Sequence, residues 1–365
     1  MSYAQIRSTV MGAVAAFSLI AVTSSFGQQA GGPALNPRHP DTYVVQRGDT
    51  LWDIASMFLR DPWYWPEIWQ INPQVENPHL IYPGDILSLA FLDNGNPVVQ
   101  LTRGADSRPV EAGPTDRLSP RIRSEAIEEA IPTIPYDAIS AFLSRPAVLD
   151  PRELGRMPYI FAHPEGLLGA AGQETYVRGL EDAPAGTIYS VVHAGDALVD
   201  PDDGDVLGYQ GLYVGEGRLR QSGDPATLYL TETAREASIG DYVVAEQQVT
   251  PITFFPSAPD SNIEGRIISV LDGVSVIGQY QIIVINRGAR DGIEPGNVMS
   301  VYQAGDLVAD RTRKSGFSSE KVQLPDRLAA TTMVFRVFDR MSYALVMEAT
   351  REIRLLDTVR NPESS

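Results

Sequence analysis

The chain has 365 residues, with 29 Lys+Arg against 46 Asp+Glu and a formal net charge of −17 at pH 7. This length allows two or three domains, and the acidity disfavours binding to the phosphate backbone of nucleic acids. Because the chain contains no Cys, disulfides, thiolate nucleophiles and Cys-ligated zinc are excluded. The 31 Gly and 27 Pro residues favour turns and short strands over long helices.

The N-terminal residues have the layout of a secretory signal. Arg7 is the only charged residue among the first 27, and a mostly apolar stretch follows at 10–22. Small residues precede a predicted cleavage before Gln28. A membrane-spanning helix needs about 20 apolar residues, so we predict a cleaved signal at 1–27 and no permanent membrane span. The next segment, 28–40, is rich in Gly, Pro and Gln and is predicted to be a tether.

The block 41–92 opens with a predicted strand at 43–46, which Arg47-Gly48-Asp49 turns. Thr50 followed by Asp53 fits a capping box at the start of a helix. Beyond Thr50, four apolar residues recur with the spacing of one buried helical face. They are Leu51, Ile54, Ala55 and Phe58.

A second helix and a second strand complete the block. Pro66 begins the helix, and Asn72-Pro73 ends it because the residue before a proline disfavours helical backbone. The turn 81–85 then leads into a strand at 86–89. The predicted order is β-α-α-β, which places this block in the α+β class.

All four Trp of the chain lie in this block, at positions 52, 63, 65 and 69. They can stack on sugar rings or form the core of a small module that has little other apolar content. For Trp52 and Trp69 we favour the core. Trp63 and Trp65 lie between the two helices, where exposure to a ligand or partner is an open alternative.

The block resembles the LysM family of small peptidoglycan- and chitin-binding modules. The resemblance is carried by the runs 43–55, Asn72-Pro73 and 80–85. One departure is the stretch 59–66, which is longer and more aromatic than the usual turn between the helices. The resemblance implies a shallow groove between the first strand–helix loop and the loop before the last strand, in which N-acetylglucosamine units lie.

An N-acetyl sugar offers an amide donor, an amide acceptor and an apolar methyl group. Backbone groups around 48–50 can pair with the amide, and the side chains of Leu51, Ile81 and Tyr82 can contact the methyl group and the sugar faces. Such a site needs no cofactor and no metal. The glycan-binding residues that the resemblance implies are Gly48, Asp49, Thr50, Leu51, Asn72, Ile81, Tyr82 and Pro83.

The region 93–172 is predicted to be a linker with short helices. Turn signals crowd its start, and the stretch 121–160 looks mainly helical, although prolines interrupt it. Asp150-Pro151 fits the start of a helix, with an N-cap followed by proline.

From about residue 173 the pattern changes to short β-type runs. Five of them are Thr187–Val192, Thr227–Thr231, Gln281–Ile285, Val298–Tyr302 and Thr332–Val337. An internal repeat aligns 190–196 with 300–306, and 232–241 with 348–357. We therefore expect two similar β-rich domains, barrel- or sandwich-like, at 173–248 and 262–362.

The sequence offers no recognisable catalytic or metal motif. The four His are scattered without metal-ligand spacing, and neither a Gly-x-Ser-x-Gly elbow nor a P-loop occurs. A glycosidase needs only two carboxylates without fixed spacing, so a murein hydrolase with its catalytic domain at 173–362 remains a less favoured alternative. We predict that the chain is not an enzyme.

The whole arrangement is similar to the LysM proteins associated with type IV pilus secretins, the TsaP type. Its C-terminal part resembles the C-terminal domain of the flagellar assembly protein FlgT, on residues 284–296, 343–348 and 357–359. The resemblance implies a periplasmic anchor that binds peptidoglycan and contacts an outer-membrane secretin ring, where its copies form a ring-like array. A LysM protein that serves another envelope assembly, such as a flagellar ring, is the alternative.

Overall fold

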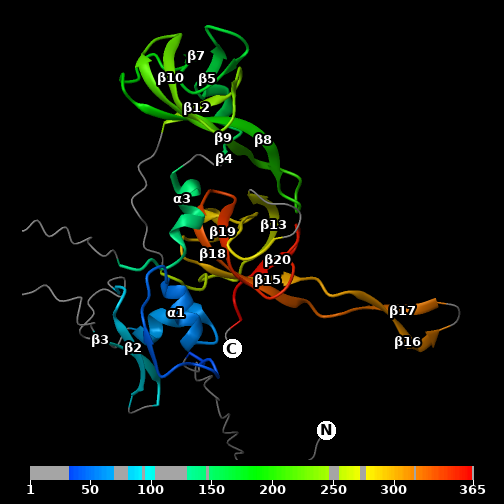
Figure 1. Ribbon diagram of the computed structural model, residues 1–365. Helices are drawn as coiled ribbons and strands as arrows, with labels where there is room; N and C mark the ends of the chain where they lie inside the picture. Colours follow the sequence, from blue (N-terminus) through cyan, green and yellow to red (C-terminus); the bar gives the residue numbers. More distant parts are fainter. Residues whose placement is uncertain are drawn as a thin grey trace, which may run out of the picture. The chain divides into compact units, whose positions relative to one another are not determined.

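The computed structural model describes residues 33–69, 81–92, 95–102, 130–144, 148–245, 255–271, 277–315 and 318–363. Within these ranges the fold is mixed, with few helices, a small three-stranded sheet and two β-barrels (Figure 1). The sequence predicted an α+β chain, with a small β-α-α-β module followed by β-rich domains, and the described fold agrees with this coarse outline. The predicted signal segment, 1–27, lies outside the described residues.

The first helix forms as predicted. Helix α1 spans Leu51–Phe58, and the Thr50 hydroxyl caps it by accepting the Asp53 amide at 3.1 Å. The same hydroxyl donates to the Asp53 carboxylate at 2.7 Å, which completes the local cap. The residues of the predicted apolar face are all buried, and Trp52 is buried with them.

The second helical element begins earlier than Pro66. A 3₁₀ turn over Pro62–Tyr64 leads directly into α2, Trp65–Trp69. Pro62 suits the start of such a turn because its φ is already restricted. Trp65 is only 2% exposed and lies in the core of this module. The alternative of an exposed Trp65 is therefore wrong, whereas Trp63 is half-buried.

Three strands complete the module, in the order β1 (Thr42–Val44), β2 (Ile86–Phe91) and β3 (Pro97–Thr102). The third strand lies in the segment predicted to be a linker. It forms because Val98 and Val99 are buried, and because Gly95, at a φ of 84°, allows the tight return from β2.

Part of the predicted tether is also ordered against this module. Leu35 forms an isolated bridge with Leu59, and the Asn36 amide donates to the Phe58 carbonyl at 3.0 Å. The chain before β1 therefore closes the end of α1.

Only a short part of the stretch expected to be helical is a helix. Helix α3 spans Tyr136–Ser144, and the preceding residues 131–134 are not helical. Asp150-Pro151 does not begin an α-helix. Asp150 instead accepts hydrogen bonds from Arg152, and the chain makes a turn and one 3₁₀ turn, Leu154–Arg156.

The first β-rich body is a sheet in the order β10-β7-β5-β12-β8-β9-β4, and an additional β9–β10 pairing closes six of its strands into a ring. Its first ring strand, β5, lies in the region predicted to be a linker. Strand β4 (Val148–Leu149) lies outside the ring, at the edge of the sheet, and pairs with β9. A separate two-stranded sheet joins β6 (Leu168–Gly169) to β11 (Ala237–Ser238). The ring strands are β5 (Tyr159–Ala162), β7 (Glu174–Arg178), β8 (Ile188–Val199), β9 (Val206–Gln221), β10 (Ala226–Thr233) and β12 (Tyr242–Ala245).

The second β-rich body is a closed barrel in the order β13-β14-β19-β18-β15-β20. A long hairpin of β16 (Leu307–Ser315) and β17 (Ser318–Gln323) is inserted between β15 and β18 and extends away from the barrel (Figure 1). The barrel strands are β13 (Glu264–Leu271), β14 (Ile282–Ile285), β15 (Val298–Gln303), β18 (Arg327–Val337), β19 (Ser342–Ala349) and β20 (Thr358–Arg360).

The two rings have the same topology. If the six strands of each are numbered along the chain, both close in the order first, second, fifth, fourth, third, sixth. The repeat segments 190–196 and 300–306 begin on the third strand of their respective rings, β8 and β15. All five β-type runs named from the sequence overlap strands of these rings.

Candidate glycan-binding site

The loop between β1 and α1 is a turn that Asp49 holds. The Asp49 carboxylate accepts the Tyr43 hydroxyl at 2.9 Å and the Gln46 amide at 2.8 Å. Burial of Tyr43, with help from this bond to Asp49, raises the pKa of Tyr43 to about 12. Gly48 has a φ of 97°, a conformation that a residue with a side chain adopts only at a cost. The Asp49 side chain therefore shapes the loop.

The loop before β2 is a second tight turn. The Asp85 amide donates to the Tyr82 carbonyl at 3.1 Å, and the buried Asp85 carboxylate accepts the Tyr82 amide at 3.1 Å. Pro83 followed by Gly84, at a φ of 92°, fits a type II turn.

Val45 joins the two loops through its backbone. Its amide donates to the Asp85 carbonyl at 2.9 Å, and its carbonyl accepts the Gly84 amide at 2.8 Å. Leu51 and Ile81, one from each side, belong to the same hydrophobic cluster. The structure thus brings the two groups of predicted glycan-binding residues together, as one preformed unit.

The predicted residues differ in how accessible they are. Gly48 is exposed, and Asp49, Tyr82 and Pro83 are half-buried. In contrast, Thr50 and Leu51 are 3% exposed and Ile81 is fully buried. Asn72 lies outside the described residues.

Residues from a distant part of the chain account for some of this burial. The segment Ile131–Ile134, here called the crossing segment, bonds to both sides of the unit. Its Pro132 carbonyl accepts the Leu51 amide at 2.9 Å, and its Ile131 amide donates to the Ile81 carbonyl at 2.8 Å. Ile131 also joins the hydrophobic cluster of this module. The sequence signal for this segment was the pair Pro132 and Pro135, since the residue before each proline favours extended backbone.

Trp52 is buried, as the core interpretation required, but its cluster consists mostly of residues outside the predicted block. It belongs to a cluster with Ile134 of the crossing segment and with Ile139 and Leu143 of α3. Trp69 is 6% exposed and lies in the module's own core. Neither ring presents a face for sugar stacking.

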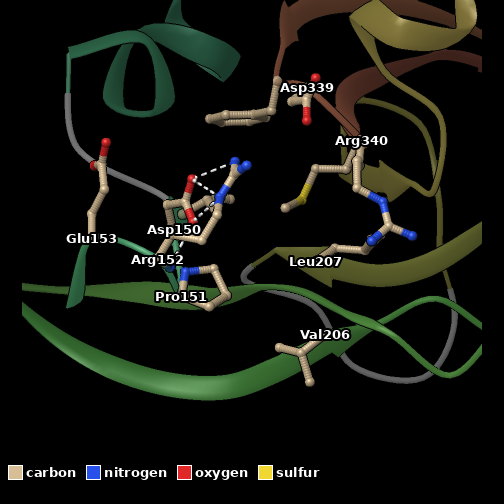
Figure 2. Close-up of a pocket in the computed structure, with 11 residues that line it drawn as sticks. Asp150, Pro151, Arg152, Glu153, Val206, Leu207, Asp339 and Arg340 are labelled. Atoms are coloured by element: carbon tan, nitrogen blue, oxygen red, sulfur yellow. Dashed lines mark hydrogen bonds and ion pairs between the residues drawn. The ribbon is translucent and has the colours of Figure 1, made fainter. Parts of the chain in front are cut away.

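A separate cavity of about 420 Å³ has three carboxylates in its lining, those of Asp150, Glu153 and Asp339. Figure 2 shows the Asp150 carboxylate facing the Arg152 guanidinium, with bonds as short as 2.8 Å. These hydrogen bonds hold the pKa of Asp150 below its ordinary value. A glycosidase acid needs a raised pKa, so Asp150 is poorly suited to that role.

Two further observations concern metals and membranes. In the part of the chain that the structure describes, no group of three or more His, Asp or Glu is arranged to hold a metal ion. Within the same ranges, no helix combines the length and the apolar character needed to cross a membrane.

Comparison with known proteins bears on the first module. Residues 43–90 match the LysM domain family. The chain is also similar to the uncharacterized protein YqbP of Bacillus subtilis (strain 168), with 38% identity over 60 residues. That stretch is 14% of this chain and 27% of YqbP, so the chain spans about a quarter of the curated relative it matches. The chain therefore carries a LysM domain at residues 43–90, a non-catalytic binding module for peptidoglycan-type glycans.

Proposed function

We propose that this protein is a non-catalytic periplasmic anchor, exported by a cleaved signal, that tethers an outer-membrane secretin ring of a type IV pilus to the cell wall. The LysM domain binds peptidoglycan, and the β-barrels contact the secretin. The LysM match over residues 43–90 supports the first half of this proposal. The similarity of the whole arrangement to the secretin-associated LysM proteins supports the second half.

The observation that carries the glycan-binding part is the pairing of Val45 with Gly84 and Asp85. It holds the two loops in one fixed unit, with Gly48, Tyr82 and Pro83 at its accessible rim. A preformed site loses little conformational entropy when it binds a ligand. We assign the sugar contacts to this rim and to the backbone of 48–51.

A single shallow sugar site binds weakly, so the anchor works through many copies. Copies arranged around a secretin ring raise the effective concentration of LysM domains at the wall. The two barrels share one strand order, and each copy can therefore offer two related surfaces to a ring of repeated subunits.

Co-sedimentation of the full chain with purified peptidoglycan tests the wall-binding half. Tyr82→Ala removes a half-buried ring at the rim and should weaken binding about tenfold, as truncation of an aromatic contact residue typically does. Phe91→Ala is the matched control, because Phe91 is 61% exposed at the end of β2, away from both loops. Equal sedimentation of Tyr82→Ala and the wild type would refute the assignment of the rim.

The partner is tested by cross-linking in cells. The alternative partner is a flagellar ring, and one feature favours it. The residues similar to FlgT lie on the second barrel, on β14 and the loop that follows it, on β19 and on β20. Recovery of the secretin with the full chain, and its loss when 262–362 are deleted, supports the pilus anchor. Recovery of flagellar ring proteins in place of the secretin would refute the pilus anchor and support the flagellar partner.

A further inference from the structure

We propose that the crossing segment, Ile131–Ile134, is an intramolecular competitor of the glycan, so that the LysM domain binds the wall only when this segment is displaced. The inference rests on the proposed glycan-binding function of the two loops. In the free protein the crossing segment occupies this site and controls access to it.

The backbone of the crossing segment pairs with the first turn of α1. The amides of Leu51 and Trp52 lie in the first turn of α1, where no intrahelical acceptor is available. The carbonyls of Pro132 and Thr133 accept them at 2.9 and 3.1 Å. The Thr50 hydroxyl serves a different amide, that of Asp53, so the crossing segment supplies acceptors that a ligand would otherwise have to supply.

The contacts of the crossing segment match those that an N-acetyl sugar can make. The acetamido group of N-acetylglucosamine carries one carbonyl acceptor, one N–H donor and one methyl group. The crossing segment presents a carbonyl to the Leu51 amide and an N–H to the Ile81 carbonyl, 2.8 Å away. Its Ile131 side chain, 5% exposed, packs in the cluster that contains Leu51 and Ile81. The same three kinds of contact are therefore already made by the chain itself.

The crossing segment is also held from its far side, by contacts outside the LysM domain. Ile134 is 2% exposed and shares a cluster with Trp52 and with Ile139 of α3. Helix α3 is in turn bonded to β18, since the Arg336 guanidinium donates to the Phe142 carbonyl at 2.6 Å. Release of the segment is therefore coupled to the position of α3.

With a competitor of this kind, the apparent glycan affinity equals the affinity of the open site multiplied by the fraction of molecules in which the site is open. If the closed form is dominant, opening the site permanently should raise glycan affinity by about tenfold or more. The probe is chitohexaose, a soluble oligomer of N-acetylglucosamine, titrated by calorimetry into the full chain.

Ile131→Asp is the opening variant, because a carboxylate is not tolerated among the apolar side chains that surround Ile131. Leu167→Asp is the matched control, since it places the same change on a residue that is 78% exposed. The expected result is tighter binding by Ile131→Asp and wild-type binding by Leu167→Asp. Unchanged or weaker binding by a folded Ile131→Asp overturns the proposal.

A second measurement covers the case in which Ile131→Asp does not fold. The chain has no Cys, so Pro132→Cys gives a single labelling site on an exposed residue of the crossing segment. An environment-sensitive fluorophore there should respond to chitohexaose with a saturable change, whereas the same label at Leu167→Cys should not. Glycan binding without any response at position 132 overturns the proposal.

The two proposals fail in different ways. If neither the wild type nor any variant binds chitohexaose or peptidoglycan, the glycan-binding function itself is wrong, and the competitor falls with it. If all of them bind with equal affinity, the function stands and only the competitor is refuted.

Discussion

Asn286 donates a hydrogen bond of 2.7 Å to the Asp200 carboxylate, and both side chains are buried. Asn286 directly follows β14, whereas Asp200 begins the turn between β8 and β9. The Asn286 side-chain oxygen, Oδ1, also accepts the Arg266 backbone amide at 2.6 Å. The Asn286 side-chain amide thus donates to a buried carboxylate and accepts from a backbone amide of β13. It connects the β8–β9 turn to the second barrel.

We predict that Asn286→Ala lowers the free energy of unfolding by about 2–3 kcal/mol, because it leaves the buried Asp200 carboxylate without this donor. Urea denaturation measures the effect. Gln221→Ala, on an exposed residue of β9, should change stability by less than about 0.5 kcal/mol. Equal midpoints for the two variants would show that Asp200 is satisfied without Asn286.

The same turn gives a pH-dependent prediction. Hydrogen bonding from Arg287, at 2.8 Å, is the main cause that lowers the pKa of Asp202 below its ordinary 3.8. A depressed carboxyl pKa contributes stability above the unfolded-state value, and this stability is lost as the pH falls through the folded-state value. The wild type should therefore exceed Asp202→Asn in stability at pH 6, and the difference should shrink below pH 3.8. A difference that stays constant down to pH 2 would contradict this.

Trp52 provides a test of the core around α1. We predict that Trp52→Ala lowers the free energy of unfolding by about 3–5 kcal/mol, the usual cost of truncating a buried aromatic ring. Trp63→Ala is the matched control, since this ring is only half-buried, and its cost should be less than half as large. Thermal melts followed by circular dichroism measure both. A similar small shift for the two variants would place Trp52 at the surface.

The cap of α1 gives a smaller effect. Thr50→Ala removes the acceptor of the Asp53 amide and should cost about 0.5–2 kcal/mol. Ser56→Ala removes a hydroxyl from an exposed position of the same helix and should be close to neutral. If both variants melt alike, the capping bond does not stabilise the helix in solution.

The sequence predicted those parts of the LysM domain that local rules determine. The capping box at Thr50 and the spacing of Leu51, Ile54, Ala55 and Phe58 are local patterns, and α1 follows them. The β-type runs were likewise found because alternation and β-branched residues mark strands wherever they pair. Both kinds of signal lie within a few neighbouring residues.

The elements that the sequence did not predict are held by residues far away in the chain. Strand β3 forms because it pairs with β2 along its whole length and because Val99 packs into the core of the module. Strand β5 has only four residues, and its pairing partners β7 and β12 lie farther along the chain. The crossing segment was expected to be part of a helical stretch, but it is not helical. Local patterns could not reveal this, because its contacts with Leu51 and Ile81 span about 50–80 positions in the sequence.

The common strand order of the two barrels affects how whole domains can be inserted into or deleted from such a chain. In each ring the first and last strands are neighbours, with Tyr159 opposite Tyr242 in one and Glu264 opposite Arg360 in the other. The chain therefore enters and leaves each barrel at the same seam. A unit with adjoining ends can be inserted or deleted as a whole without rethreading what precedes or follows it. A gene for this architecture can accordingly gain or lose a whole barrel without changing the strand order of the barrel that remains.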